Sequence, residues 1–78
     1  MLIITKADAR RPGALCEVIG ETATRYDVTV LSDTALPLSV EGGHRGTAHY
    51  VVKSRGIDYA DVTAGQYEDY LARWLGIF

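Results

Sequence analysis

The stretch ALCEVIGETATRYDVTVLSD, residues 14–33, carries the strongest structural signal in this chain. In its second half, Tyr26, Val28 and Val30 alternate with polar residues. β-Branched and aromatic residues at a period of two are typical of a strand with one buried face. The stretch therefore predicts a β-hairpin whose second arm turns Tyr26, Val28 and Val30 toward a core. The predicted arms are residues 15–20 and 25–31, and the polar link between them is 21–24.

Further short strands are predicted on both sides of the hairpin. Their ranges are 2–5, 36–40, 47–53 and 57–59, and the proline within 36–40 suits the edge of a sheet. In the strand 47–53, alternation places Ala48, Tyr50 and Val52 on one face, which we expect to be the core face. The other face carries Thr47, His49, Val51 and Lys53; we expect His49 and Lys53 to point away from the core, and Val51 is the open case.

The C-terminal segment changes to a helical period. Thr63 followed by Gln66 has the spacing of a capping box, and Gly76 suits the position just after a helix. Between them an apolar stripe recurs at three- and four-residue intervals; its members are Tyr67, Tyr70, Leu71, Trp74 and Leu75. We predict one amphipathic helix over about 63–76.

Together these elements predict a single small domain, residues 1–78, that is mainly β with one C-terminal helix (α+β). Four or five short strands favour a small half-open antiparallel barrel, because curling reduces the exposed edges of a sheet. The helix is expected either to plug one open end or to cover one face. A chain this short buries only a little over ~60% of its unfolded surface, so a groove or an interface is the expected functional surface.

The glycine-rich stretch EGGHRG, residues 41–46, has two interpretations. A phosphate-binding loop requires glycines between a strand and a helix, with a lysine that reaches the phosphates. Here the glycines lead into a predicted strand, and no such lysine follows. A dinucleotide fingerprint fails the same test, because no helix opens there. We therefore interpret the stretch as a loop in which glycines supply positive φ angles.

Charge is nearly balanced over the whole chain. Eight Lys and Arg against ten Asp and Glu give a net charge of −2, which provides no overall attraction to nucleic acid. Locally the charges are uneven: residues 44–55 contain three cations, two histidines and no acid, whereas 58–69 contain four acids and no cation. One surface is therefore expected to be positive and another negative.

The cellular location is predicted from cysteine usage and from the apolar runs. Cys16 is the single cysteine, which excludes an internal disulfide and suits the reducing cytoplasm. The opening MLII is too short for the apolar part of a signal peptide, and no run approaches the ~18 apolar residues that span a membrane. We expect a cytoplasmic protein without membrane contact.

Enzymatic chemistry has little support in these residues. Cys16 lies in an apolar predicted strand, where a free cysteine acts as a small hydrophobic residue rather than as a nucleophile. His44 and His49 would need two more ligands to hold zinc. We predict no enzymatic activity, no metal and no cofactor.

Three surfaces are candidates for binding a partner. An acidic face is predicted from Asp58, Asp61, Glu68 and Asp69. A basic face, which suits phosphates or a carboxylate-rich protein but equally suits plain solvation, is predicted from Arg45, His49, Lys53 and Arg55. An apolar interface, for a protein partner or for a second copy in a homodimer, is predicted from Tyr67, Tyr70, Trp74 and Phe78, unless these residues form the core.

Three segments carry a resemblance to known proteins. They are PGAL at 12–15, GETATRYDVTV at 20–30 and HRGTAHYVVKSRGI at 44–57. With them the chain resembles the SH3-like barrels, including the KOW-type modules of transcription and ribosomal proteins. Its ETxxRYxV … GTxxYVxKS layout is also similar to short reading frames of bacteriophages and mobile elements. The resemblance covers about residues 13–57 and implies a binding module with an accessory or host-modulating role.

The sequence therefore predicts a non-enzymatic protein–protein interaction module. In its most concrete form, this is a phage or mobile-element protein that binds and inhibits or modulates a host complex, of the anti-CRISPR type. Its acidic face would then imitate the phosphates of nucleic acid. The alternative is a nucleic-acid-binding barrel that uses the basic face and exposed tyrosines, and whose affinity falls steeply with salt.

Overall fold

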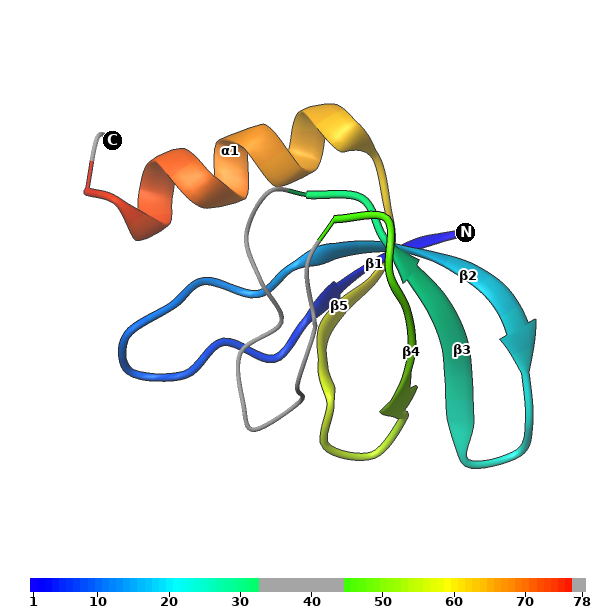
Figure 1. The fold of residues 1–78 in the computed structure, drawn as a ribbon. Helices are drawn as coiled ribbons and strands as arrows, with labels where there is room; N and C mark the ends of the chain where they lie inside the picture. Colours follow the sequence, from blue (N-terminus) through cyan, green and yellow to red (C-terminus); the bar gives the residue numbers. More distant parts are fainter. Residues whose placement is uncertain (33–44, 77–78) are drawn as a thin grey trace.

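The computed structural model describes residues 1–32 and 45–76, which form one antiparallel sheet and one C-terminal helix (Figure 1). The elements are β1 (Leu2–Thr5), β2 (Leu15–Glu21), β3 (Arg25–Val30), β4 (Ala48–Val52), β5 (Ile57–Val62) and α1 (Ala64–Trp74). The predicted mainly β, α+β fold is confirmed. The predicted strand 36–40, most of the loop 41–46, His44 and Phe78 lie outside the described residues.

The hairpin formed by β2 and β3 confirms the prediction from residues 14–33. Cys16 lies opposite Val30, and Val18 lies opposite Val28. Val28 and Val30 are fully buried and Tyr26 is half-buried, so the predicted core face is correct. The hairpin turn is closed by a hydrogen bond of 2.9 Å from the Thr22 amide to the Arg25 carbonyl.

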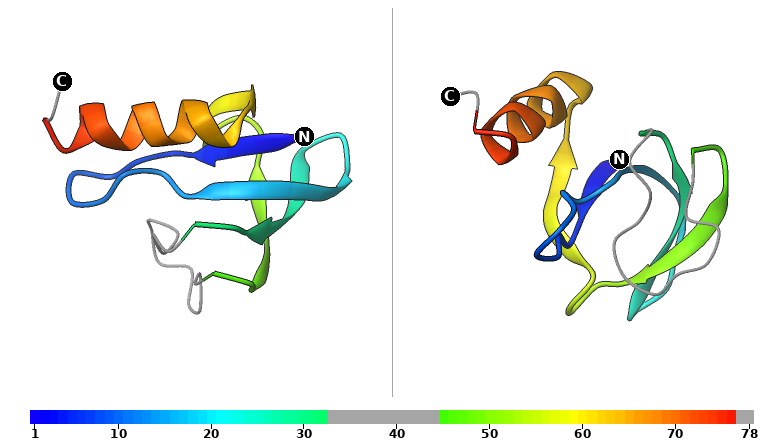
Figure 2. Two further views of the ribbon diagram at one scale, coloured as in Figure 1. Left: turned by 90° about the horizontal axis from the view of Figure 1, so that it is seen from above. Right: turned by 60° about the vertical axis from the view of Figure 1, so that its left-hand side comes forward.

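The strand order β4-β3-β2-β1-β5 places two consecutive strands at opposite ends of the sheet. β4 and β5 are joined only by residues 53–56, and the Gly56 amide donates back to the Val52 carbonyl at 2.8 Å. So short a link requires the sheet to curl until these two strands approach each other (Figure 2, right). The two strands do not pair, so the sheet is curled but not closed into a barrel.

Two apolar clusters lie on opposite faces of the sheet, because neighbouring residues of a strand point in opposite directions. The inner cluster, on the concave face, consists of Ile3, Ala14, Cys16, Val28, Val30 and Val51. The outer cluster consists of Ile4, Leu15 and Tyr67. Since Tyr67 belongs to α1, the helix covers the outer face of β1 and β2 and does not plug an open end (Figure 2).

The predicted orientation of β4 is wrong. Val51 is only 9% exposed and belongs to the inner cluster, whereas Tyr50 is 57% exposed. The pairing with β3 explains the reversal: Val51 lies opposite Tyr26, and directly opposite residues share a face of the sheet. Tyr50 instead points outward, where the Arg25 guanidinium lies 4.8 Å from the centre of its ring.

The helix α1 begins and ends as predicted. The Thr63 side chain accepts from the Gln66 amide at 3.1 Å, and the Gln66 side chain accepts from the Thr63 amide at 2.8 Å, which completes the capping box. Gly76 follows the helix with a φ of +76°, a left-handed conformation that favours glycine. Within the described part of the chain, no helix has the length and apolarity needed to cross a membrane.

Candidate functional site

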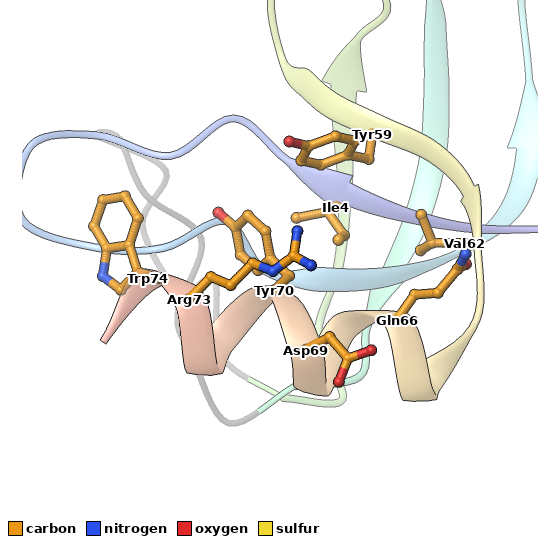
Figure 3. A pocket seen from close by; sticks show the side chains of 8 residues that line it. All are labelled: Ile4, Tyr59, Val62, Gln66, Asp69, Tyr70, Arg73 and Trp74. Atoms are coloured by element: carbon orange, nitrogen blue, oxygen red, sulfur yellow. The ribbon is translucent and has the colours of Figure 1, made fainter. Parts of the chain in front are cut away.

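A groove with a volume of about 550 Å³ lies between α1 and β5 (Figure 3). Its size falls within the range of typical binding pockets. We call it the α1–β5 groove; it is lined by Ile4, Tyr59, Val62, Gln66, Asp69, Tyr70, Arg73 and Trp74. Ile4 is buried in the outer cluster, so the groove lies directly over the core contact between helix and sheet.

Three of the eight residues that line the groove are aromatic. Tyr59 on β5 meets Tyr70 on α1 edge to face, with ring centroids 6.0 Å apart and an interplanar angle of 75°. Tyr59 is 56% exposed and Trp74 is 39% exposed. Large aromatic side chains left accessible beside an apolar floor are typical of binding surfaces.

The helix wall is held in place by Gly13, in the loop before β2. The Tyr67 hydroxyl donates to the Gly13 carbonyl at 2.8 Å, and the Gly13 amide donates to the Tyr70 hydroxyl at 2.7 Å. The two tyrosine rings also stack, with centroids 5.8 Å apart. Burial is the main cause that raises the pKa of the Tyr70 hydroxyl above its ordinary value. These contacts fix α1 against the sheet and thereby set the shape of the groove.

The strand wall, β5, is irregular at two aspartates. In the pairing with β1, Asp58 and Asp61 are the extra residues at two register shifts, and Asp61 has a φ of 55°. The Asp58 carboxylate accepts from the Ala7 amide at 3.0 Å. Bulges and charges are both features that protect an edge strand from pairing with another strand. A partner at this groove is therefore expected to contact side chains rather than to extend the sheet.

The predicted acidic face is divided between β5 and α1. Asp58 and Asp61 lie on the strand, and Glu68 and Asp69 lie on the helix; all four are exposed. Among the residues that line the α1–β5 groove, Asp69 is the only member of this set. The remaining three lie on the same two elements but do not line the groove.

The predicted basic face follows β4 and the residues on either side of it. Arg45 and Arg55 lie beyond opposite ends of β4. Lys53 forms an ion pair with Glu21, and its ammonium group lies 4.7 Å from the centre of the Tyr26 ring. The His49 Nε2 lies 3.0 Å from the Thr47 hydroxyl oxygen. At least three of these four residues, Arg45, His49 and Lys53, therefore already interact with neighbouring groups.

The predicted apolar interface is shared between core and groove. Tyr67 is 5% exposed and belongs to the outer cluster, whereas Tyr70 and Trp74 line the groove. Sequence reasoning missed the other groove residues, which are Ile4, Tyr59, Val62, Gln66 and Arg73. The sequence did contain a signal for the two missed residues of the helix, Gln66 and Arg73. Together with Asp69 they follow a helical spacing along one flank of the apolar stripe.

The groove offers recognition groups: aromatic rings, one carboxylate, one guanidinium and one amide. Within residues 1–32 and 45–76, no three His, Cys, Asp or Glu side chains are grouped so that they could hold a metal ion. Comparison of the chain with protein families, with curated proteins and with solved structures finds no match. The structure shows a small curled antiparallel sheet with one C-terminal helix, and no match supports the resemblance to SH3-like or KOW-type barrels.

Cys16 is expected to be chemically inert in the folded protein. It is fully buried in the inner cluster, and burial raises the pKa of its thiol to about 12 from 9.0. Because the thiolate is the reactive form, alkylation by iodoacetamide at pH 8 should be roughly a thousandfold slower in the folded chain than in denaturant. Mass spectrometry of the alkylated protein measures this ratio. Equal rates in the two states would contradict the buried position.

The same thiol makes stability depend on pH. Its pKa is raised on folding, so the unfolded state loses its proton first, and the free energy of unfolding falls as pH rises from 9.0 toward about 12. The expected slope approaches ~1.4 kcal/mol per pH unit from this group. Urea titrations over this pH range measure the free energy of unfolding of the wild type and of Cys16→Ala. The difference between the two is the contribution of the thiol, because tyrosine and lysine ionisation affects both proteins.

Proposed function

We propose that this protein is a non-enzymatic protein-binding module that receives part of its partner in the α1–β5 groove. The observation that carries the proposal is the exposure of Tyr59 and Trp74, at 56% and 39%, above the buried Ile4. Tyrosine and tryptophan are enriched among the residues that dominate binding energy at protein interfaces. The tyrosine contacts to Gly13 support the proposal further, because a wall that is fixed before binding lowers the entropic cost of association.

The resemblance to phage and mobile-element reading frames supports a host complex as the partner and inhibition or modulation, of the anti-CRISPR type, as the outcome. In that setting Asp58, Asp61, Glu68 and Asp69 would occupy the place of nucleic-acid phosphates on a basic host surface. Their positions on β5 and α1, the two walls of the groove, agree with that role.

Nucleic-acid binding through Arg45, His49, Lys53 and Arg55 is the alternative proposal. The ion pair of Lys53 with Glu21 and the separation of Arg45 from Arg55 weaken it. If it holds, binding will depend strongly on salt and will decrease when Arg45 and Arg55 are replaced by alanine.

A comparative pull-down from nuclease-treated bacterial lysate tests the proposal. Its variants are wild type, the double variant Tyr59→Ala/Trp74→Ala, and Tyr50→Ala, whose tyrosine is 57% exposed but lies on β4, outside the groove. We expect a stoichiometric protein partner to be retained by the wild type and by Tyr50→Ala, and to bind the double variant at least about tenfold more weakly. Circular dichroism confirms that each variant is folded.

Three outcomes would contradict parts of the proposal. Equal retention by the double variant and by Tyr50→Ala would exclude the groove as the docking surface. Recovery of nucleic acid alone from untreated lysate would favour the alternative. Unchanged binding after replacement of Asp58, Asp61, Glu68 and Asp69 by lysine would exclude phosphate imitation.

A further inference from the structure

Charge is concentrated on the segment that builds the groove. Residues 57–74, which include β5 and α1, contain four acids and one arginine, a net charge of −3. The rest of the chain contains seven Lys and Arg and six Asp and Glu, a net charge of +1, and the two parts sum to the overall −2. A negative field around a partly enclosed groove raises the local concentration of cations.

The groove itself contains one carboxylate and one guanidinium, both from α1. Asp69 and Arg73 are four residues apart, about one turn along the helix, and their charged ends point in different directions (Figure 3). Neither forms an ion pair with any described residue. The third polar residue, Gln66, uses its side-chain oxygen in the capping box. Asp69 is therefore the anion in the groove that remains available to a guest.

The aromatic walls provide a second attraction for a cation. In the described part of the chain, the cations that lie over aromatic rings are Arg25 over Tyr50 and Lys53 over Tyr26. No cation of residues 1–32 or 45–76 lies over the rings of Tyr59 and Trp74, which remain accessible to solvent. The faces of tyrosine and tryptophan attract lysine ammonium and arginine guanidinium groups.

We propose that the α1–β5 groove binds a cationic side chain of the partner, with Asp69 as its counter-ion and Tyr59 and Trp74 as the rings against which it packs. This inference rests on the proposed function and names the chemistry of the partner. Arginine is favoured over lysine, because a planar guanidinium both stacks on an aromatic ring and pairs with a carboxylate through two hydrogen bonds. Arg73 lines the same groove as Asp69 without pairing with it, so its positive charge repels a cationic guest.

The role of Arg73 distinguishes this proposal from its opposite. If the guest is cationic, removing the charge of Arg73 strengthens binding and removing the charge of Asp69 weakens it. If the guest is an anion held by Arg73, both effects reverse. The two charge-removing variants, at Arg73 and at Asp69, therefore show whether the groove accepts a positive or a negative guest.

Fluorescence of Trp74, the single tryptophan of the chain, gives a direct readout, because this residue lines the groove. The probe is a short peptide of alternating glycine and arginine, titrated at low salt. The comparison peptides replace arginine by citrulline, its uncharged isostere, or by glutamate. We expect a saturable change in Trp74 emission with the arginine peptide and none with the other two.

The variants test the contacts one by one. Asp69→Asn should weaken binding of the arginine peptide roughly five- to tenfold, and Arg73→Gln should strengthen this binding roughly threefold. Glu68→Gln is the matched control, because it removes the same charge from an exposed helix position that does not line the groove. It should change the affinity by less than about twofold.

Several results would overturn the inference. One is equal affinity for the arginine and citrulline peptides. Another is an equal effect of Asp69→Asn and Glu68→Gln on binding. A third is binding of the glutamate peptide that is lost in Arg73→Gln. A fourth is the absence of any change in Trp74 emission. The loss of the partner by Tyr59→Ala/Trp74→Ala in the pull-down is a separate result, so the groove could remain a docking surface if its preference for a cation were refuted.

Discussion

Replacing Gly13 by alanine is expected to lower the free energy of unfolding by at least about 3 kcal/mol. A Cβ atom at this position would lie 1.8 Å from the Thr5 carbonyl oxygen and 2.8 Å from the Ile4 Cγ2. The Thr5 backbone cannot move away easily, because its amide donates to the Ala14 carbonyl at 3.0 Å and its hydroxyl accepts from the Ala14 amide at 2.8 Å. For a small domain this loss is a large part of the total stability.

Urea denaturation followed by circular dichroism measures the effect. Gly65→Ala is the matched control, because a Cβ there would meet only the Thr63 hydroxyl oxygen, at 3.9 Å. That variant lies in the first turn of α1 and should be neutral or stabilised by about 0.5 kcal/mol, since alanine favours the helix. A Gly13→Ala protein within about 1 kcal/mol of the wild type would show that the loop can shift without loss.

Removing the Tyr67 side chain is expected to have an effect of similar size. Tyr67 is 5% exposed, packs with Ile4 and Leu15, and donates its hydroxyl proton to the Gly13 carbonyl at 2.8 Å. Tyr67→Ala should cost about 3–5 kcal/mol, because it leaves a cavity at the contact between α1 and the sheet. Tyr67→Phe should cost about 1–2 kcal/mol, because it removes only the hydrogen bond to a buried carbonyl.

The two tyrosines should also be energetically coupled. Tyr70 accepts from the Gly13 amide at 2.7 Å and stacks on Tyr67, so both hold the same glycine. A double-mutant cycle of Tyr67→Phe and Tyr70→Phe should therefore give a coupling energy of about 0.5–1 kcal/mol. Tyr50→Phe, on the outer face of β4, is the control and should add independently to Tyr67→Phe. Strict additivity of the Tyr67 and Tyr70 variants would indicate that each bond acts alone.

Local patterns predicted the elements that depend on near neighbours in the chain. The hairpin of β2 and β3 was predicted because period-two alternation and a short polar link specify both arms. The helix was predicted because Thr63, Gln66 and Gly76 supply its capping groups within a few residues of its ends.

The orientation of β4 shows where such patterns fail. The run AHYVV has apolar residues on both faces, so alternation alone supports either orientation. The pairing with β3, which places Val51 opposite Tyr26 and His49 opposite Val28, decided that Val51 is buried. A shift of register by one residue exchanges the two faces of a strand, and only the partner strand specifies the register.

The α1–β5 groove was likewise only partly predictable. The helical stripe indicated Tyr70 and Trp74 as interface candidates, and the acid count between 58 and 69 indicated Asp69. Tyr59 and Ile4 come from β5 and β1, and no local spacing connects these residues to the helix. They meet Tyr70 because β1 pairs with β5 and because Tyr67 and Tyr70 hold the helix to Gly13.

By itself, the sequence determined the approximate positions of β1 to β5 and of α1, the buried face of β3, and the uneven distribution of charge. These depend on residue periodicity, capping groups and composition, which act over a few residues. The tertiary structure alone decided the strand order β4-β3-β2-β1-β5, the inward face of β4 and the position of the groove. These features depend on backbone pairing and packing between residues far apart in the chain, such as Tyr26 with Val51, Ile4 with Tyr59 and Gly13 with Tyr67.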